Sequence, residues 1–311
     1  MEKTYELMPN AKMLLSSLRS VGYTEETAIA DIVDNSISSG ANTIQLYFDW
    51  DDQAILIADN GKGMQKRELL DSMKIGSSDP GVTRSDLGRF GMGMKTASFS
   101  LGKQILVITK QKDEINNAEW NLEYVENEDK WEILIHSDEK IDTYIKSKTD
   151  KIEFQNWDEG TLISLSMLDK LIDENNMQKS KVKFYKTVEK VKKHLAMIFH
   201  RFIEEDNLQI YVNKNLLEAW NPFIRQNPAT MELACEELFD GKTIVSIEPY
   251  ILPHKTKFED EEAFKKAGGA KDWLAHQGFY VYRNRRLIVY GTWFGKFKKE
   301  PARFNGRKIE K

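Results

Sequence analysis

The 311-residue sequence has little of several features that define whole classes of protein. Cys235 is its one cysteine, so the chain can form neither an internal disulfide nor a cysteine-based zinc site, and nothing points to an oxidising compartment. Apolar runs such as 54–58 are far too short to span a bilayer, and residues 1–10 lack the apolar core of a signal peptide. The five histidines show no metal-ligand spacing. These absences predict a cytoplasmic protein with no membrane role and no metal chemistry beyond Mg²⁺.

Glycine and proline are also scarce, at 18 and 7 residues, while 41% of the chain is hydrophobic. This composition is typical of a globular protein rather than a collagenous or disordered one. At about 150 residues per domain, the length predicts two compact domains. We place the boundary so that residues 1–172 form the first domain and residues 173–311 the second.

The net charge is small, because 45 Lys and Arg residues against 49 Asp and Glu residues leave a formal charge of -4. This balance argues against a surface adapted all round to nucleic acid. Residues 283–311 differ, with ten basic residues against Glu300 and Glu310. That segment is either a solvated terminal face or a contact for a polyanion such as DNA, and the sequence leaves both readings open.

Hydrophobic periodicity predicts an α/β order of elements. Helices are expected from the leucine-rich opening segment to residue 22, then at 24–37, around 69–73, at 94–101 and at 180–203. Strands are expected at 44–49, 53–58, 105–110, 120–125, 131–136, 161–167, 208–212, 244–252, 279–282 and 287–290. We expect 138–151 to be a surface excursion and 76–93, which is rich in glycine, serine and aspartate, to be a long loop.

The predicted helix at 24–37 carries a polar pair. Asp31 and Asn35 are four residues apart, so they share one helical face and can reach the same ligand. The neutral amide oxygen of Asn35 can ligate Mg²⁺ while leaving the ion positive enough to bridge phosphates, and a carboxylate one turn earlier can orient water. Taken alone, the pair is better explained as the polar side of an ordinary amphipathic helix.

A second cluster, Asp59-Asn60-Gly61-Lys62-Gly63-Met64, directly follows the predicted strand at 53–58. An acid at a strand end followed by Gly-x-Gly permits close approach of the backbone to a flat ligand, and the carboxylate can accept a hydrogen bond from an exocyclic amine. By itself, the cluster indicates a turn more often than a binding site.

The third cluster runs from Gly88 to Thr96 and opens a predicted helix. Glycine-rich backbone at a helix N-terminus offers free amides and a positive dipole end to phosphate, and Lys95 adds a point charge. Two well-known phosphate motifs do not fit. Met94 separates Gly93 from Lys95, which breaks the Walker pattern, and Thr96 stands where the dinucleotide pattern needs its third glycine. A P-loop or Rossmann enzyme is therefore disfavoured.

In order and spacing, the three clusters closely resemble the ATP-binding motifs of the GHKL superfamily, and most of all its MORC and MutL-type members. The resemblance implies catalytic roles for Asp31 and Lys95 and Mg²⁺ ligation by Asn35. The nucleotide-binding residues that it implies are Asn35, Asp59, Gly61, Gly63, Met64, Gly88, Phe90, Gly91, Met92, Gly93, Met94, Lys95 and Thr161. One departure affects the mechanism, because the family's usual general base is glutamate and the matching residue here is Asp31.

The same resemblance implies an α/β fold, in which a Bergerat-type sandwich with a mixed sheet is followed by a smaller S5-like α/β transducer domain. Nucleotide would lie between helices and sheet, under a lid at 65–90. The segment 277–288 carries the likeness to the transducer. Lys296, Lys298 and Lys299 are candidates for the transducer lysine that reaches the γ-phosphate. We expect the sequence to end before that lysine's strand, which would make this chain a fragment or a shortened member.

The function implied by the resemblance is slow, Mg²⁺-dependent hydrolysis of ATP by a nucleotide-gated clamp. Two copies of the chain would form the dimer when ATP binds, and DNA is a possible partner through residues 283–311. The alternative is a switch like a heat-shock chaperone, which binds ATP in the same pocket but grips polypeptide instead of DNA. Binding to client protein without binding to nucleic acid would favour the alternative.

Overall fold

The structure is a computed structural model and describes residues 5, 9–20, 22–76, 93–239, 241, 244–269, 273 and 275–293. The chain divides into two compact units, one of residues 1–195 and 202–218 and the other of residues 196–201 and 219–311. This division differs from the expected boundary between residues 172 and 173. The first unit takes in residues 173–195 and 202–218, and the second of these stretches belongs to it because a strand near residue 210 pairs into its sheet.

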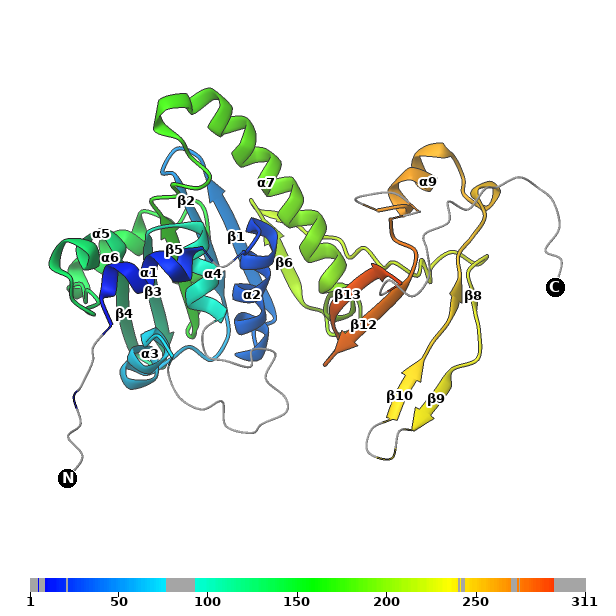
Figure 1. Ribbon diagram of the computed structural model, residues 1–311, viewed down its shortest axis with the longest axis horizontal. Coiled ribbons are helices and arrows are strands. Elements are labelled where there is room, and N and C mark those ends of the chain that lie inside the picture. Colours follow the sequence, from blue (N-terminus) through cyan, green and yellow to red (C-terminus); the bar gives the residue numbers. More distant parts are fainter. Residues whose placement is uncertain are drawn as a thin grey trace. The chain divides into compact units, whose positions relative to one another are not determined.

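A seven-stranded mixed sheet is the centre of the first unit (Figure 1). Its order is β4-β3-β5-β2-β1-β6-β7, and β1 and β6 are parallel while the other neighbours are antiparallel. The strands are β1 (Thr43–Asp49), β2 (Ala54–Asp59), β3 (Gln104–Gln111), β4 (Glu114–Asn121), β5 (Gly160–Ser166), β6 (Gln209–Val212) and β7 (Asn215–Leu216). The helices in this part of the chain are α1 (Ala11–Arg19), α2 (Glu25–Ser38), α3 (Lys66–Met73), α4 (Gly93–Leu101), α5 (Leu122–Glu128), α6 (Asp138–Lys146), α7 (Met177–Ile198) and α8 (His200–Glu205), with 3-10 turns η1 (Phe154–Asn156) and η2 (Glu174–Asn176). This arrangement confirms the predicted mixed α/β fold of Bergerat type.

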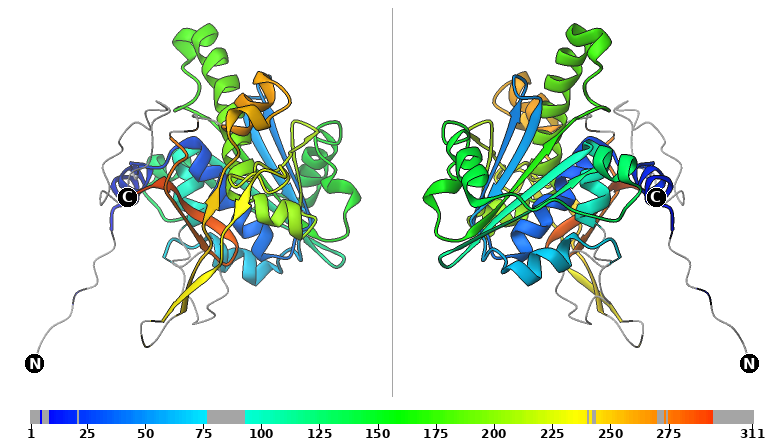
Figure 2. Two further views of the ribbon diagram at one scale, coloured as in Figure 1. Left: turned by 90° about the vertical axis from the view of Figure 1, so that its right-hand side faces the viewer. Right: turned by 90° about the vertical axis from the view of Figure 1, so that its left-hand side faces the viewer.

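Helices α1, α2 and α4 lie on one side of the sheet, opposite α6 (Figure 2). The sequence accounts for α2, because Thr24 caps its first turn in a capping box with Thr27 and its apolar residues from Ala28 to Val33 are buried. Helix α7 adds Phe184, whose ring packs edge-on against Phe48 and Trp50. The side of the sheet that carries α2 is therefore well packed.

Helix α6 covers the second face of the sheet, so the expected surface excursion at 138–151 is wrong. Ile141 and Ile145 are four residues apart and are both buried in a cluster with Leu56, Leu106 and Leu162 of the sheet. The rest of α6 is mostly charged or polar, which hides its helical period in the sequence. Burial of two isoleucines against the sheet places this helix.

The segment after β3 corrects two further predictions. The strand expected at 120–125 is the end of β4 followed by α5, because the Asn121 side chain accepts a hydrogen bond from the Tyr124 amide and caps a helix there. At 131–136 the structure has an isolated bridge between Glu119 and Leu134 instead of a strand. The Asn117 side chain bonds both the amide and the carbonyl of His136, so it satisfies backbone groups that a strand would have paired.

In the described residues of the second unit, the sheets are three separate two-stranded ribbons. Their strands are β8 (Met231–Glu232) with β11 (Tyr250–Ile251), β9 (Glu236–Phe239) with β10 (Ile244–Ile247), and β12 (Phe279–Arg283) with β13 (Arg286–Thr292). Helix α9 (Glu261–Ala267) and the 3-10 turn η3 (Lys255–Lys257) lie between them in sequence. The single strand expected at 244–252 divides into two, because Pro249 has no amide hydrogen to donate to a ladder.

Among the helices of the described residues, none combines the length and the apolar character needed to cross a bilayer.

Candidate nucleotide-binding site

Three polar side chains form a row across the middle strands of the sheet. The strand register places Asp59 at the end of β2 beside Thr161 of β5, and Thr161 beside Thr109 of β3. Residues paired in this way project to the same face, here the face beneath α2. All three side chains are buried. The sheet therefore presents a carboxylate and two hydroxyl groups side by side.

Asp59 joins this row to helix α2. The Ser36 hydroxyl donates to Oδ2 of Asp59 at 2.7 Å, and the Gly61 amide donates to Oδ1 at 2.9 Å. Burial raises the pKa of Asp59, and hydrogen bonds from Ser36, Gly61 and the backbone of Thr161 oppose that rise. Because an ionised carboxylate has about four acceptor positions, it retains room for one donor from a ligand.

The glycines after β2 let the backbone approach its neighbours closely. Gly63 has φ +63°, and a Cβ there would lie 1.8 Å from the carbonyl oxygen of Lys110. Gly160, at the start of β5, has φ +147°, and its Cβ would lie 2.1 Å from the carbonyl oxygen of Asp59. A side chain at either position would clash with backbone, so both glycines are required for the fold around Asp59. At Gly61 a Cβ would meet the Ser39 hydroxyl at 1.9 Å.

Thr109 holds the loop that follows the second cluster, and sequence reasoning missed this residue. Its hydroxyl accepts a hydrogen bond from the Met64 amide at 2.8 Å and donates to the carbonyl of Gly160 at 3.1 Å. The Thr161 hydroxyl lies 3.4 Å from it. Nothing within the predicted strand at 105–110 singles out Thr109, because its role depends on the register between β3 and β5.

Helix α2 carries the first cluster, Asp31 and Asn35, and its Ser36 bonds Asp59 of the row. Asn35 is exposed, and its side-chain amide donates to the carbonyl oxygen of Asp31 at 2.9 Å. This bond directs the amide nitrogen to the helix and leaves Oδ1, a hard neutral oxygen of the kind that Mg²⁺ prefers, available to a ligand. The Tyr23 hydroxyl donates to Oδ2 of Asp31 at 2.9 Å, which orients that carboxylate. The catalytic role of Asp31 and the Mg²⁺-ligand role of Asn35 stay predictions.

The third cluster is described only from α4 onward. Gly93 and Met94 are the first two residues of α4. The remaining predicted residues of the cluster, Gly88, Phe90, Gly91 and Met92, lie outside the described residues.

Lys95 follows in the first turn of α4, a helix that packs beside α2. Its side chain is buried, and its ammonium group donates to the carbonyl oxygen of Lys74, just after α3. Burial lowers the pKa of Lys95 to about 8. A lysine in this position keeps most of its charge at pH 7 and loses it within a mildly alkaline range.

This pKa predicts how triphosphate binding depends on pH. Above about pH 8 the free protein increasingly holds Lys95 neutral, so affinity for ATP is expected to fall and to approach a loss of about tenfold per pH unit. Affinity for adenosine, which has no phosphate, is expected to stay constant. Calorimetric titrations between pH 7 and 9 measure both. In Lys95→Met the pH dependence should vanish, and a variant that kept the full dependence would contradict the assignment.

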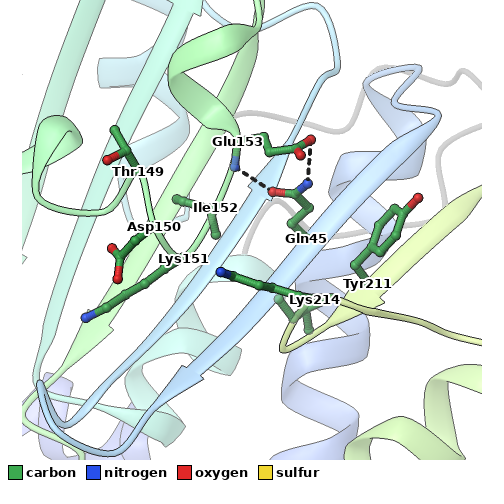
Figure 3. A pocket seen from close by; sticks show the side chains of 9 residues that line it. Gln45, Thr149, Asp150, Lys151, Ile152, Glu153, Tyr211 and Lys214 are labelled. Carbon is green, nitrogen blue, oxygen red and sulfur yellow. Dashed lines mark hydrogen bonds between the residues drawn. The ribbon is translucent and has the colours of Figure 1, made fainter.

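A separate cavity of about 310 Å³ lies on the other face of the sheet, near β1 and β6 (Figure 3). The Gln45 amide bonds both the backbone and the carboxylate of Glu153 on its wall, at 2.7 and 3.1 Å. Gln45 pairs with Ala58, which packs in the α6 cluster, whereas Asp59 projects to the α2 side. The cavity is therefore distinct from the site around Asp59. It is lined by Gln45, Leu46, Thr149, Asp150, Lys151, Ile152, Glu153, Tyr211 and Lys214.

Comparison with known proteins indicates which family this domain resembles. Residues 23–158 match the family described as histidine kinase-, DNA gyrase B-, and HSP90-like ATPase. This stretch contains α2, Lys95, and two of the three residues of the row, Asp59 and Thr109, while Thr161 between them in the sheet lies just beyond it. It is a GHKL-type ATPase domain.

Relatives specify the kind of GHKL domain. The ATPase morc-1 of Caenorhabditis elegans is 33% identical over 119 residues, which cover 37% of this chain and 14% of that protein. The ATPase MORC2B of Mus musculus is 27% identical over 92 residues, covering 28% and 9%, and the ATPase MORC2 of Homo sapiens is 25% identical over 118 residues, covering 35% and 11%. The matched region thus spans about a seventh or less of these relatives. The domain is of the GHKL/MORC type.

Proposed function

We propose that this chain binds ATP with Mg²⁺, hydrolyses it slowly and uses the nucleotide to control association of two copies. The observation that carries the proposal is the hydrogen bond between Ser36 and Asp59. This bond ties α2, the helix that bears Asp31 and Asn35, to the carboxylate that would bind adenine in this proposal. The names of the MORC relatives, which call them ATPases, support hydrolysis as the activity.

Each group in the site has a chemical role in this proposal. Asp59 accepts a hydrogen bond from the exocyclic amine of adenine, and burial of its carboxylate makes that bond selective for a donor. Asn35 would hold Mg²⁺ through Oδ1, and the ion would offset the negative charge of the phosphates. Lys95 supplies a positive charge for the phosphates from α4. Asp31, oriented by Tyr23, positions the attacking water.

The proposal extends to residues 173–311 as a transducer domain and to DNA as a partner. The basic residues of 283–311 motivate the DNA contact. Arg285 donates to the carbonyl oxygen of Arg201 at 3.5 Å, and the guanidinium of Arg286 lies 5.9 Å from the ring centre of Phe199. Replacing these arginines would also remove contacts within the second unit. The test therefore uses Lys296, Lys298 and Lys299.

The central experiment measures nucleotide affinity and molar mass together. The full chain is titrated with a non-hydrolysable ATP analogue, with Mg²⁺ and with a chelator, while light scattering reports the mass. We expect tighter binding with Mg²⁺ and a doubling of mass only when the analogue is bound. Binding without any change of mass would leave an ATPase domain and remove the clamp. No detectable binding would remove both.

The DNA partner is tested through the salt dependence of binding to duplex DNA. Replacing Lys296, Lys298 and Lys299 by glutamine should lower the slope of log affinity against log salt by about three, since each phosphate contact contributes about 0.9. A matched control replaces three exposed lysines of α7, Lys186, Lys190 and Lys193, and should leave the slope unchanged. Equal slopes for the native chain and the variant without Lys296, Lys298 and Lys299 would exclude these lysines as the DNA contact.

A further inference from the structure

Residues 231–251 form two successive two-stranded ribbons, β8 with β11 and β9 with β10, which we call together the acidic ribbon. The β9–β10 part exposes apolar side chains on both of its faces. Phe239 pairs with Ile244 across β9 and β10, and the next pair is Leu238 with Val245. Successive pairs in a ribbon point to opposite faces. Phe239 is 71% exposed and Leu238 is 54% exposed, so each face has an uncovered apolar pair. A two-stranded ribbon of this kind is at best marginally stable in water by itself, and it requires a cover.

The negative charge of the acidic ribbon restricts which kind of segment can cover its exposed apolar pairs. Residues 231–251 contain five acidic residues and one basic residue. Glu236 and Glu237 are both exposed and lie on opposite faces, each beside an apolar pair. A second copy of the ribbon would bring like charges together, and a nucleic acid would be repelled. The chemistry of the ribbon therefore selects a segment that is both apolar and basic.

This chain contains such a segment at residues 294–311, which we call the basic tail. It has seven basic residues against two acidic ones, interspersed with Phe294, Phe297 and Phe304. The charges of tail and ribbon are thus opposite in sign, and both carry large apolar side chains.

The last described residues before the tail are linked by ring contacts to β11, the last strand of the acidic ribbon. Thr292, near the end of β13, pairs with Phe279, whose neighbour Tyr280 has its ring 5.3 Å from that of Phe223. Phe223 in turn stacks on Tyr250 of β11 at 4.3 Å. Eighteen residues can extend about 60 Å, and the nine residues from 231 to 239 span about 30 Å. The tail can therefore reach the whole ribbon.

We propose that the basic tail of this chain binds back onto its own acidic ribbon. The phenylalanines of the tail cover the apolar pairs, and its lysines face Glu236 and Glu237. Tethering makes the contact intramolecular, so that a weak intrinsic affinity is sufficient for the tail to be bound most of the time. This inference goes beyond the proposed ATPase function and does not depend on it.

The chain provides its own probe for this contact. Cys235 is exposed, is the one cysteine of the sequence and lies just before β9 in the ribbon. A bound tail should slow its alkylation by a small neutral maleimide. If the effective concentration of the tail at the ribbon is about 1 mM and the dissociation constant of the tail is about 0.1 mM, the alkylation of Cys235 should be slowed about tenfold. Each rate is divided by the rate for the same variant in urea, which removes differences in the thiol's intrinsic reactivity.

Charge exchange in the full chain, without nucleic acid, tests the pairing. Reversal of the tail (Lys296→Glu with Lys298→Glu), or of the ribbon (Glu236→Lys with Glu237→Lys), should each raise the alkylation rate of Cys235 about tenfold. The combined variant should restore slow alkylation, and the control Lys186→Glu with Lys190→Glu on α7 should match the native chain.

Three results would overturn the proposal. The first is an equal rate for the native chain and the tail reversal. The second is failure of the combined variant to restore protection. The third is protection that grows with protein concentration, which would identify a second copy of the chain as the cover.

Discussion

Replacing Asp31 by alanine is expected to lower ATP turnover by about 10²- to 10⁴-fold, the usual contribution of a positioned acid or base group. Nucleotide affinity should change little, because the role proposed for Asp31 is to position water, with no contact to adenine or Mg²⁺. The Tyr23 hydroxyl donates to Oδ2 of this carboxylate at 2.9 Å, which favours one orientation of the carboxylate. Steady-state turnover and equilibrium binding of a non-hydrolysable analogue measure the two effects separately.

Two variants sharpen this test. Tyr23→Phe removes the orienting hydroxyl and keeps the carboxylate, so its turnover should fall by less than that of Asp31→Ala while its affinity for nucleotide is unchanged. Asp31→Glu restores the residue usual at this position in the family and should retain activity. An Asp31→Ala protein that hydrolyses ATP at the native rate would show that another group positions the water.

The second large effect is expected at Asp59, where Asp59→Asn should weaken ATP binding by about 10- to 100-fold. A hydrogen bond to a charged group contributes about 1.5 to 3 kcal/mol, and an amide can present a donor where the adenine amine needs an acceptor. Burial raises the pKa of Asp59, so the carboxyl group of Asp59 binds its proton more tightly in the folded protein than in the unfolded chain. Stability contributed by this group therefore falls as the pH rises through the raised pKa. Asparagine carries no charge, so the variant avoids the free-energy cost of burying an ionised carboxylate at neutral pH. It should therefore remain folded.

The same pKa predicts the acid limit of nucleotide binding. Affinity of the native protein should decline as Asp59 is protonated, beginning at a higher pH than the range of an ordinary exposed aspartate. The control is Asp142→Asn on α6, an exposed aspartate on the helix that covers the other face of the sheet. It should bind ATP like the native chain. Native affinity in Asp59→Asn, or a melting temperature far below that of the control, would contradict this account.

Much of the first unit was predictable from local sequence. The strands at 44–49, 53–58, 105–110 and 161–167 follow from short apolar runs, and α2 follows from its capping box and period. The wrong predictions concern segments whose structure depends on contacts with residues far away in the sequence. Helix α6 is placed by burial of two isoleucines against the sheet, and the strand expected at 131–136 is replaced by side-chain bonds from Asn117.

By itself, the sequence determined the three glycine and acid clusters, their order, and hence the GHKL resemblance, because residue type and spacing along one chain are enough to define a motif. Only the tertiary structure decided that Asp59, Thr161 and Thr109 form one row, because β2, β5 and β3 are brought together by a register that no single strand encodes. The tertiary structure also decided that Ser36 bonds Asp59 and that Lys95 is buried, since both depend on how α2 and α4 pack. Contacts between residues far apart in the chain arise from packing, and packing is a property of the folded whole.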